Sequence, residues 1–271
     1  GPASGQTGEN RKIRPKCAIW PADWRILIQS ALEFLGDAFY DRRMRWLMMC
    51  WGLVLGGVVL VGCQRQPSET VNYGETLQTV RFDHDFEWEN YANAAQKVEF
   101  AVEDGAYRAR AWDGGFTWTL NSQSHTDVVI QADVEQLSEY ADNAFGLMCR
   151  ASPANNGDGY FFFISGDGFY TLRRGASSEV LPIIPWTYTD TIQQGRSINR
   201  IRIVCVEDYL ALYVNGQFVA EARDPLFASG YAGLSAAVPE GGDVDVQFDD
   251  VIIRAAALEG HAAATAPAGP E

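Results

Sequence analysis

Most of the chain between residues 80 and 254 consists of short runs in which apolar and polar residues alternate, separated by Gly, Asp and Asn. Alternation with a period of two places successive side chains on opposite faces of a strand. About a dozen such runs at regular turn spacing, without a helical pattern among them, predict an all-β antiparallel sandwich or barrel. The clearest runs are KVEFAVED, AYRARAW, FTWTLNS, TDVVIQADVEQL, NAFGLMCRA, GYFFFIS, GFYTLRR, NRIRIVCV, YLALYVNGQFVAEA, YAGLSAAV and DVDVQFDDVIIRA.

One turn in this segment is specified by its residues. Asn215-Gly216 stands between the alternating runs YLALYV and QFVAEA. A two-residue type I′ turn needs positive φ at both central positions, which Asn and Gly tolerate best. The sequence therefore predicts a β-hairpin centred on this dipeptide.

The order of several motifs resembles a known superfamily. NAFGLMCRAS and DGYFFFISGDGFYTL are followed by NRIRIVCVEDYLALYVNGQFV, then by SGYAGLSAA and a closing VQFDDVIIR. This succession, over residues 80–254, is similar to the concanavalin A-like jelly rolls of the laminin-G and glucanase type, and most closely to secreted bacterial domains. The resemblance implies a two-sheet jelly-roll sandwich. It implies little about activity, because the superfamily includes lectins, hydrolases and inert spacers.

Two cysteines are expected to face the interior. In FGLMCR, alternation places Cys149 on the same face as Leu147 and Arg150 on the other; in IRIVCV, Cys205 shares a face with Ile203. In an oxidising compartment the two thiols would form a disulfide. The alternative is a pair of buried free thiols, which behave as small apolar side chains.

The segment before this domain carries features of an export signal. Residues 44–63 read MRWLMMCWGLVLGGVVLVGC, in which a positive flank precedes about 15 apolar residues, fewer than the roughly 20 of a spanning helix. LVGC resembles a bacterial lipobox, which implies lipidation of Cys63, export and anchoring at the extracytoplasmic or cell-surface side of a membrane. The alternative is a short transmembrane helix. Residues 1–43 are expected to be either an over-extended N-terminus or an amphipathic helix.

Two flanking segments lack the alternating pattern. Residues 64–79 are polar and predict a flexible tether between Cys63 and the domain. Residues 255–271 are rich in Ala, Gly and Pro and predict a disordered tail.

The charge of the chain limits its partners. Residues 1–63 hold 8 of the 21 Lys and Arg and 5 of the 35 Asp and Glu, which leaves 13 basic and 30 acidic residues and a net charge near −17 after Cys63. Such a domain repels nucleic-acid phosphates, so nucleic acid is excluded as a partner. By the same argument, a polysaccharide ligand is expected to be neutral rather than uronic or sulfated.

No catalytic motif is present. Glucanases of the superfamily carry alternating carboxylates on one strand, but the nearest segment here, DVDVQFDD, has Gln247 at a central position and no glutamate. His84, His125 and His261 have no zinc-ligand spacing. We therefore expect no catalytic residues.

A structural calcium ion is a further expectation. Jelly rolls of this type often hold calcium where the first and last strands meet, and Asp83, Asp85, Asp249 and Asp250 place carboxylate oxygens at those positions. No other cofactor is implied.

Aromatic side chains supply the candidate ligand site. Sugar rings stack on exposed aromatic faces while neighbouring polar groups bond their hydroxyls. Trp186 and Tyr188 lie in PIIPWTYTD, which reads as an exposed loop, and Trp112, Trp118 and Tyr160 are further candidates. These features favour a lipid-anchored, non-catalytic domain that binds a neutral glycan. The alternatives are a glycan-acting hydrolase with unrecognised residues and a structural or adhesive protein-interaction module.

Overall fold

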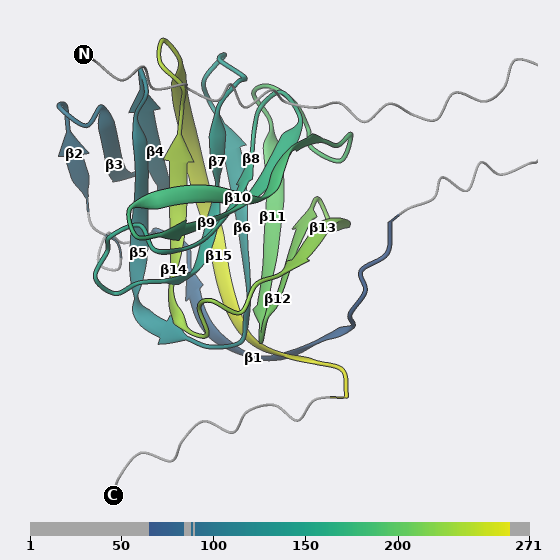
Figure 1. Ribbon diagram of the computed structural model, residues 1–271. Helices are drawn as coiled ribbons and strands as arrows, with labels where there is room; N and C mark the ends of the chain where they lie inside the picture. Colours follow the sequence, from purple (N-terminus) through teal and green to yellow (C-terminus); the bar gives the residue numbers. More distant parts are fainter. Residues whose placement is uncertain (1–64, 84–87, 89, 261–271) are drawn as a thin grey trace, which may run out of the picture. The chain divides into compact units, whose positions relative to one another are not determined.

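A computed structural model describes residues 65–83, 88 and 90–260, and in this part of the chain every regular element is a strand (Figure 1). The predicted all-β fold is confirmed. The predicted segments 1–43 and 44–63, with Cys63, lie outside the described residues, as do residues 261–271 of the tail. The strands are β1 Val71–Val80, β2 Tyr91–Asn93, β3 Val98–Glu103, β4 Ala106–Trp112, β5 Phe116–His125, β6 Val128–Gln136, β7 Ala144–Ala151, β8 Gly159–Ile164, β9 Phe169–Ala176, β10 Glu179–Tyr188, β11 Ile198–Val206, β12 Tyr209–Val214, β13 Gln217–Arg223, β14 Gly230–Ala237 and β15 Asp243–Leu258.

No helix among the described residues is long and apolar enough to cross a membrane.

The strands form two antiparallel sheets. One has nine strands in the order β13-β12-β11-β6-β15-β4-β3-β2, with β1 also paired to β15. The other has six strands in the order β10-β9-β8-β7-β14-β5. Neighbouring strands are often distant in sequence, as where β14 inserts between β7 and β5. The predicted two-sheet sandwich is thus confirmed.

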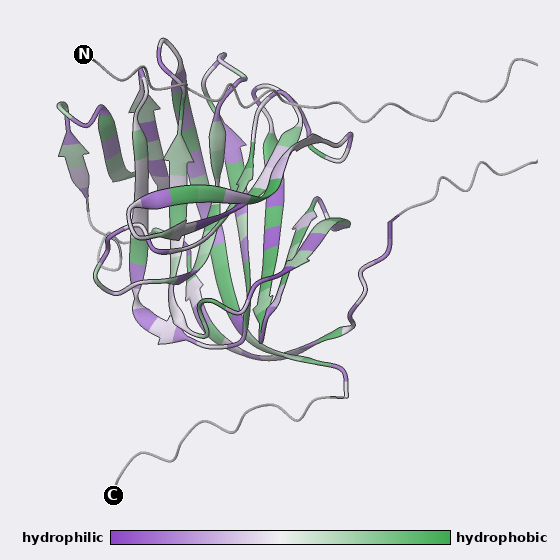
Figure 2. Cartoon of the chain, in the orientation of Figure 1, coloured by the Kyte–Doolittle hydropathy of each residue, from purple (hydrophilic) through white to green (hydrophobic). Residues whose placement is uncertain are grey.

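The alternation in the sequence corresponds to the two faces of each sheet. Figure 2 shows apolar and polar bands alternating along the strands. Leu147 and Phe162 of the six-stranded sheet and Ile203 and Phe248 of the nine-stranded sheet are fully buried in the core between the sheets. Burial of this apolar surface is the main stabilising contribution to the fold.

The Asn215-Gly216 hairpin is confirmed. These residues join β12 to β13 with φ values of 52° and 80°. The Asn215 side chain also donates a hydrogen bond to Thr191 O at 3.0 Å and accepts one from Arg200 N at 3.0 Å. The turn residue therefore fixes both the hairpin and the loop that precedes β11.

The predicted tether is corrected at its C-terminal part. Residues 71–80 are not a flexible spacer but strand β1, which pairs with the last half of β15 from Val71↔Leu258 to Val80↔Val251. Most β1 side chains are exposed, and Gly74 lies against Ala255. The strand is held by backbone pairing rather than by an apolar face, so its residues lack the alternation of a half-buried strand. β15 extends the domain to Leu258, beyond the predicted boundary at 254.

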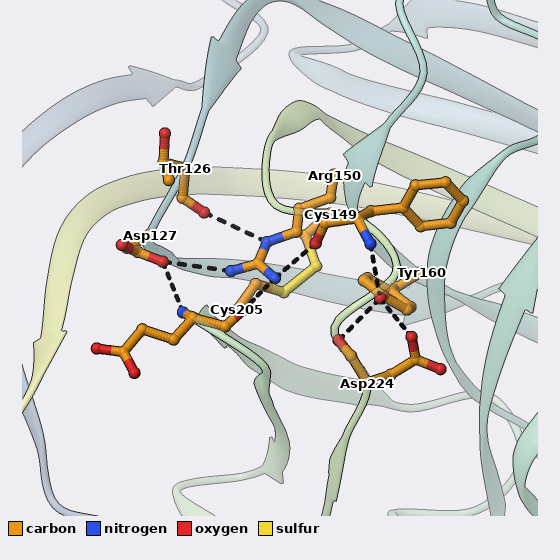
Figure 3. Close-up of a disulfide and its surroundings, with 9 residues drawn as sticks. Thr126, Asp127, Cys149, Arg150, Tyr160, Cys205 and Asp224 are labelled. Carbon is orange, nitrogen blue, oxygen red and sulfur yellow. Dashed lines mark hydrogen bonds and ion pairs between the residues drawn. A yellow bond between two sulfur atoms is a disulfide. The ribbon is translucent and has the colours of Figure 1, made fainter.

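The predicted disulfide between Cys149 and Cys205 is confirmed. It joins β7 of one sheet to β11 of the other, with a Cα–Cα distance of 6.7 Å (Figure 3). Beside it, Arg150 was expected to face away from the core but is almost fully buried. Its guanidinium donates to the carbonyl oxygens of Glu207 and Phe227 and pairs with Asp127 at 3.2 Å. Two backbone carbonyls and one carboxylate thus satisfy the Arg150 guanidinium, which the strand pattern alone predicts to face solvent.

Candidate functional site

The face of the six-stranded sheet that points away from the core carries a hollow of about 640 Å³. Each of the six strands contributes to it, from Phe116 on β5 at one edge to Trp186 on β10 at the other. Because opposite edges of the sheet line the same space, the sheet curves around it, and Figure 1 shows β10 running across the front of the other strands. We call this space the first hollow. Its lining residues are Gly114, Gly115, Phe116, Asp142, Asn143, Ala144, Phe163, Arg173, Val180, Trp186, Ala237, Val238 and Pro239.

Small residues at one end of the central strands make room for the first hollow. Ala144 on β7 and Ala237 on β14 are directly opposite each other in the sheet. Gly114 and Gly115 occupy the turn before β5, where Asp113 and Gly114 have φ values of 46° and 86°. The aromatic side chains of Phe116, Phe163 and Trp186 surround these small residues, so the hollow lies over the small residues and is bordered by aromatic rings.

Aromatic side chains continue along the same face. Phe161 and Phe163 alternate on β8 with ring centroids 5.6 Å apart, and both are buried. Phe116 lies 5.6 Å from Phe161 and 5.2 Å from Trp118, its alternate neighbour on β5. Trp118 and Trp186 both pack against this cluster. The sheet face therefore presents a line of rings running from Trp118 towards the first hollow.

Trp186 reaches the first hollow because β10 is bent. The segment PIIPWTYTD is not a loop, as the sequence suggested, but mostly the edge strand β10, paired to β9. Pro182 and Pro185 are tolerated there because an edge strand needs no ladder bond on its outer side. Register shifts between Pro182 and Ile184 and between Ile184 and Thr187 bend the strand. This bend brings the Trp186 side chain over the sheet.

Arg173 is the cation of the first hollow. It lies on β9 opposite Phe161, on the outward face, and is half-buried. Its buried Nε–H has no hydrogen-bond acceptor among the described residues, and burial lowers the pKa of the guanidinium. Asn143 is already engaged, since its side chain donates to Tyr140 O at 2.6 Å and accepts from Gly166 N at 3.0 Å. Asp142 supplies the carboxylate among the lining residues.

A second hollow of about 1450 Å³ adjoins the first and shares Gly114 and Phe116 with it. It follows β5, which among the described strands is hydrogen-bonded on one side only, to β14. Among the described residues that line it, none is charged, several are amides, and six are aromatic. Its lining residues are Gln78, Trp88, Asn90, Tyr91, Gln96, Phe100, Gly114, Phe116, Thr117, Trp118, Thr119, Leu120, Asn121, Ser122, Gln123, Pro153, Asn155 and Tyr231, with Phe100 at its apolar floor.

A loop fixes Trp118 in this second hollow. The indole N–H donates to Asn155 Oδ1 at 2.6 Å. Gly157 lies so close that a Cβ there would come within 3.3 Å of the indole ring. The positive φ values of Asn155 and Gly157, 51° and 86°, let the loop between β7 and β8 turn tightly over the ring. The orientation of Trp118 is therefore set without any ligand.

The other sequence candidates lie elsewhere. Tyr160 is not accessible to a ligand at the surface. Its side chain is fully buried, and its hydroxyl donates a hydrogen bond to Asp224 Oδ1 at 2.8 Å (Figure 3). Burial raises the pKa of its hydroxyl to about 12. Tyr188 packs edge-on against Phe169 and contacts Gln194 at 3.4 Å. Trp112 is 38% exposed at the end of β4 and lines neither hollow. The structure thus brings together only Trp118 and Trp186 of the five.

The calcium prediction rests on acidic residues that pair in other ways. Asp250 lies 3.7 Å from Arg81, and Asp249 accepts from Asp250 N at 2.7 Å. Burial, followed by the charges of Asp250, Asp83 and Asp133, raises the pKa of Asp249. Within residues 65–83, 88 and 90–260, no group of three His, Cys, Asp or Glu side chains could hold a metal ion. Asp85 lies outside the described residues, so calcium binding stays a prediction.

Known structures share this sandwich. No protein-family model matches the sequence, and a search of curated proteins found no match. Among solved structures, the carbohydrate-binding module CBM66 from Bacillus subtilis is similar, with a TM-score of 0.52, 18% identity, and coverage of 62% of this chain and 96% of the module. A Bacillus subtilis protein of unknown function with a galectin-like fold is also similar, with a TM-score of 0.49 and 12% identity. That match covers 69% of this chain and 99% of the other protein. The likeness to CBM66 shows the fold alone. It does not by itself identify a concanavalin A-like family.

Proposed function

We propose that this domain binds a glycan, without cleaving it, in the two hollows that meet at Phe116. The observation that carries the proposal is the continuous aromatic face from Trp118 to Trp186, with amide side chains beside it. Rings of this kind contact the C–H faces of sugars, and amides bond sugar hydroxyls in both directions. The similarity in fold to a carbohydrate-binding module agrees with this use of the sheet.

The distribution of carboxylates supports binding rather than hydrolysis. Glycosidic cleavage commonly needs two carboxyl groups about 5 to 9.5 Å apart across the bond. Among the described residues, Asp142 is the one carboxylate that lines the first hollow, and none lines the second. The described, uncharged lining residues of the second hollow also fit neutral sugar units, in keeping with the acidity of the domain.

The remaining parts of the proposal concern location. We infer from the lipobox-like LVGC that Cys63 carries a lipid and that the domain lies at the extracytoplasmic or cell-surface side of a membrane. In this arrangement β1 belongs to the sandwich, which leaves residues 64–70 as the segment that connects the anchor to it.

Titration of single tryptophan variants tests the binding site. The full chain, kept in a detergent without a sugar headgroup, would be titrated by calorimetry with neutral β-glucans, xylans and mannans. We expect Trp186→Ala and Trp118→Ala each to weaken binding of the preferred glycan by about tenfold, since one stacked ring contributes about 1 to 2 kcal/mol. Trp112→Ala is the matched control, because Trp112 is exposed outside both hollows.

Three results would refute the proposal. The first is that the parent binds no glycan. The second is that Trp112→Ala weakens binding as much as Trp186→Ala does. The third is release of reducing sugar from any bound polymer, which would establish hydrolysis.

A further inference from the structure

The arginines of this domain are nearly all matched to a partner, which makes Arg173 unusual. Arg202 and Arg254 lie over the Tyr73 ring, and Arg202 also lies 4.4 Å from the centre of the Tyr213 ring. Among the described residues, the buried Nε of Arg173 and that of Arg202 both lack an acceptor, but Arg202 lies over two aromatic rings, whereas no carboxylate forms an ion pair with Arg173. Arginines that pair with a carboxylate are Arg81, Arg108, Arg110, Arg150, Arg174, Arg196, Arg200 and Arg223.

An unmatched cation at this depth is costly for the fold. Removing a guanidinium from water without a counter-charge is unfavourable, and burial accordingly lowers the pKa of Arg173. The neighbouring Arg174 avoids this cost, since it pairs with Asp224 at 2.6 Å. In a domain with 30 acidic residues after Cys63, a carboxylate partner would be easy to supply. The position of Arg173 therefore points to a counter-charge that comes from a ligand.

The surroundings of Arg173 define the shape of that ligand. The side chain lies beside Phe161 on the sheet and lines the first hollow together with Trp186, Phe163 and Val180. A ring lying against Trp186 would bury its apolar face, and a carboxylate on that ring would reach the planar guanidinium, which binds carboxylates through two parallel N–H donors.

We propose that the first hollow binds a sugar residue that carries a carboxylate, and that Arg173 pairs with this carboxylate. This inference rests on the proposed function and narrows it. In this arrangement neutral units occupy the second hollow, whose described lining residues carry no charge, while one acidic unit occupies the first. The sequence-based expectation of a neutral ligand then holds for the polymer as a whole but not for this one unit.

The charge of the domain is compatible with one carboxylate but not with many. Charges farther apart than about 8 Å are largely screened at physiological ionic strength. A single carboxylate beside Arg173 therefore experiences mainly that cation, whereas a polyuronate would bring further carboxylates towards an acidic surface. Asp142, in the same hollow, disfavours a second anionic group there.

Matched pairs of sugars test this inference. The probes are methyl glycosides of glucose, galactose and mannose, each compared with the corresponding uronic acid, by ligand-observed NMR on the full chain. In at least one pair we expect the uronic acid to bind about tenfold more tightly or better, as hydrogen bonds to charged groups allow. The advantage should shrink as salt is added.

Variants then assign the effect to Arg173. Arg173→Gln should remove the advantage of the uronic acid while leaving the neutral partner's affinity within about twofold of the parent's. Arg196→Gln removes the same charge from an exposed site and should leave the advantage intact. Without ligand, Arg173→Met should melt no lower than the parent, because the variant no longer buries an unmatched cation.

The outcomes separate this inference from the proposed function. No advantage of the uronic acid in any pair, its persistence in Arg173→Gln, or a lower melting temperature of Arg173→Met would overturn the role of Arg173. If neutral glycans still bound the parent, the proposed function would stand. If no glycan bound, neutral or acidic, both would fail.

Discussion

Three tryptophans of this domain show how position within a strand decides what a residue does. Trp118 lies on the outward face of β5 and is fixed by Asn155; Trp186 lies over the same sheet face because β10 is bent. Trp112 ends β4 of the other sheet and contributes to neither hollow. The residue type is the same in all three cases. Only strand, face and register distinguish the two rings of the proposed ligand site from the exposed ring of Trp112.

A pH-dependent prediction belongs to a single carboxyl group. Burial, then the charges of Asp250, Asp83 and Asp133, raises the pKa of Asp249 above the ordinary 3.8. The folded state therefore holds this proton more tightly than the unfolded state, and the stabilisation it gives is lost as the pH rises through the folded pKa. Asp249→Asn should raise the free energy of unfolding at pH 7 by about 1 kcal/mol.

The gain from Asp249→Asn should disappear as the pH falls below 3.8, the ordinary value for the group. Thermal unfolding of parent and variant across this range measures it, and a variant less stable than the parent at pH 7 would contradict the assignment. Added calcium gives a separate result: a calcium-dependent rise in melting temperature of the parent that the variant lacks would support the calcium prediction.

At the scale of elements, the two sheets are joined covalently as well as by packing. The Cys149–Cys205 disulfide links β7 to β11 across 56 residues of chain. In the chain-entropy model, a closed loop of this length stabilises the fold by about 4 kcal/mol. We expect Cys149→Ala/Cys205→Ala to lose about this amount in denaturant unfolding. Reduction of the parent should match the double variant, and a loss below about 1 kcal/mol would show that the bridge constrains little.

The elements differ in how far the sequence predicts them. The half-buried start of β11 follows from alternation, and so do the inward cysteines, although β7 is buried on both faces; the Asn215-Gly216 hairpin follows from its turn residues. β1 was missed because it is held by backbone pairing, with few apolar side chains. β10 was read as a loop because its prolines suggested one, although edge strands tolerate them.

The candidate site was less predictable, since it depends on long-range geometry. The first hollow needs the bend in β10, and the second needs β5 beside Trp88 and Tyr91; neither is encoded in one local pattern. Arg173 was the missed residue for which a signal existed. Alternation in FYTLRR, with Tyr170 and Leu172 inward, already placed Arg173 on the outward face.

At the scale of the whole molecule, the proposed export and anchoring would decide which ligands the sandwich can contact. Cys63 lies outside the described residues, and its lipidation is inferred from LVGC. We predict that Cys63→Ser moves the protein from the membrane fraction to the soluble fraction, because no lipid would then attach at that position. If the variant still sediments with membranes after carbonate washing, a spanning helix within 44–63 is the better explanation.

The central claim is that a glycan lies along the aromatic face between Trp118 and Trp186. The most direct measurement follows the indole N–H resonances of the full chain by NMR while the glycan identified by calorimetry is added, with assignments from the tryptophan variants. The resonances of Trp118 and Trp186 should shift together and saturate at the same ligand concentration, while that of Trp112 stays in place. Shifts at Trp112 with none at Trp118 and Trp186 would place the ligand elsewhere and contradict the claim.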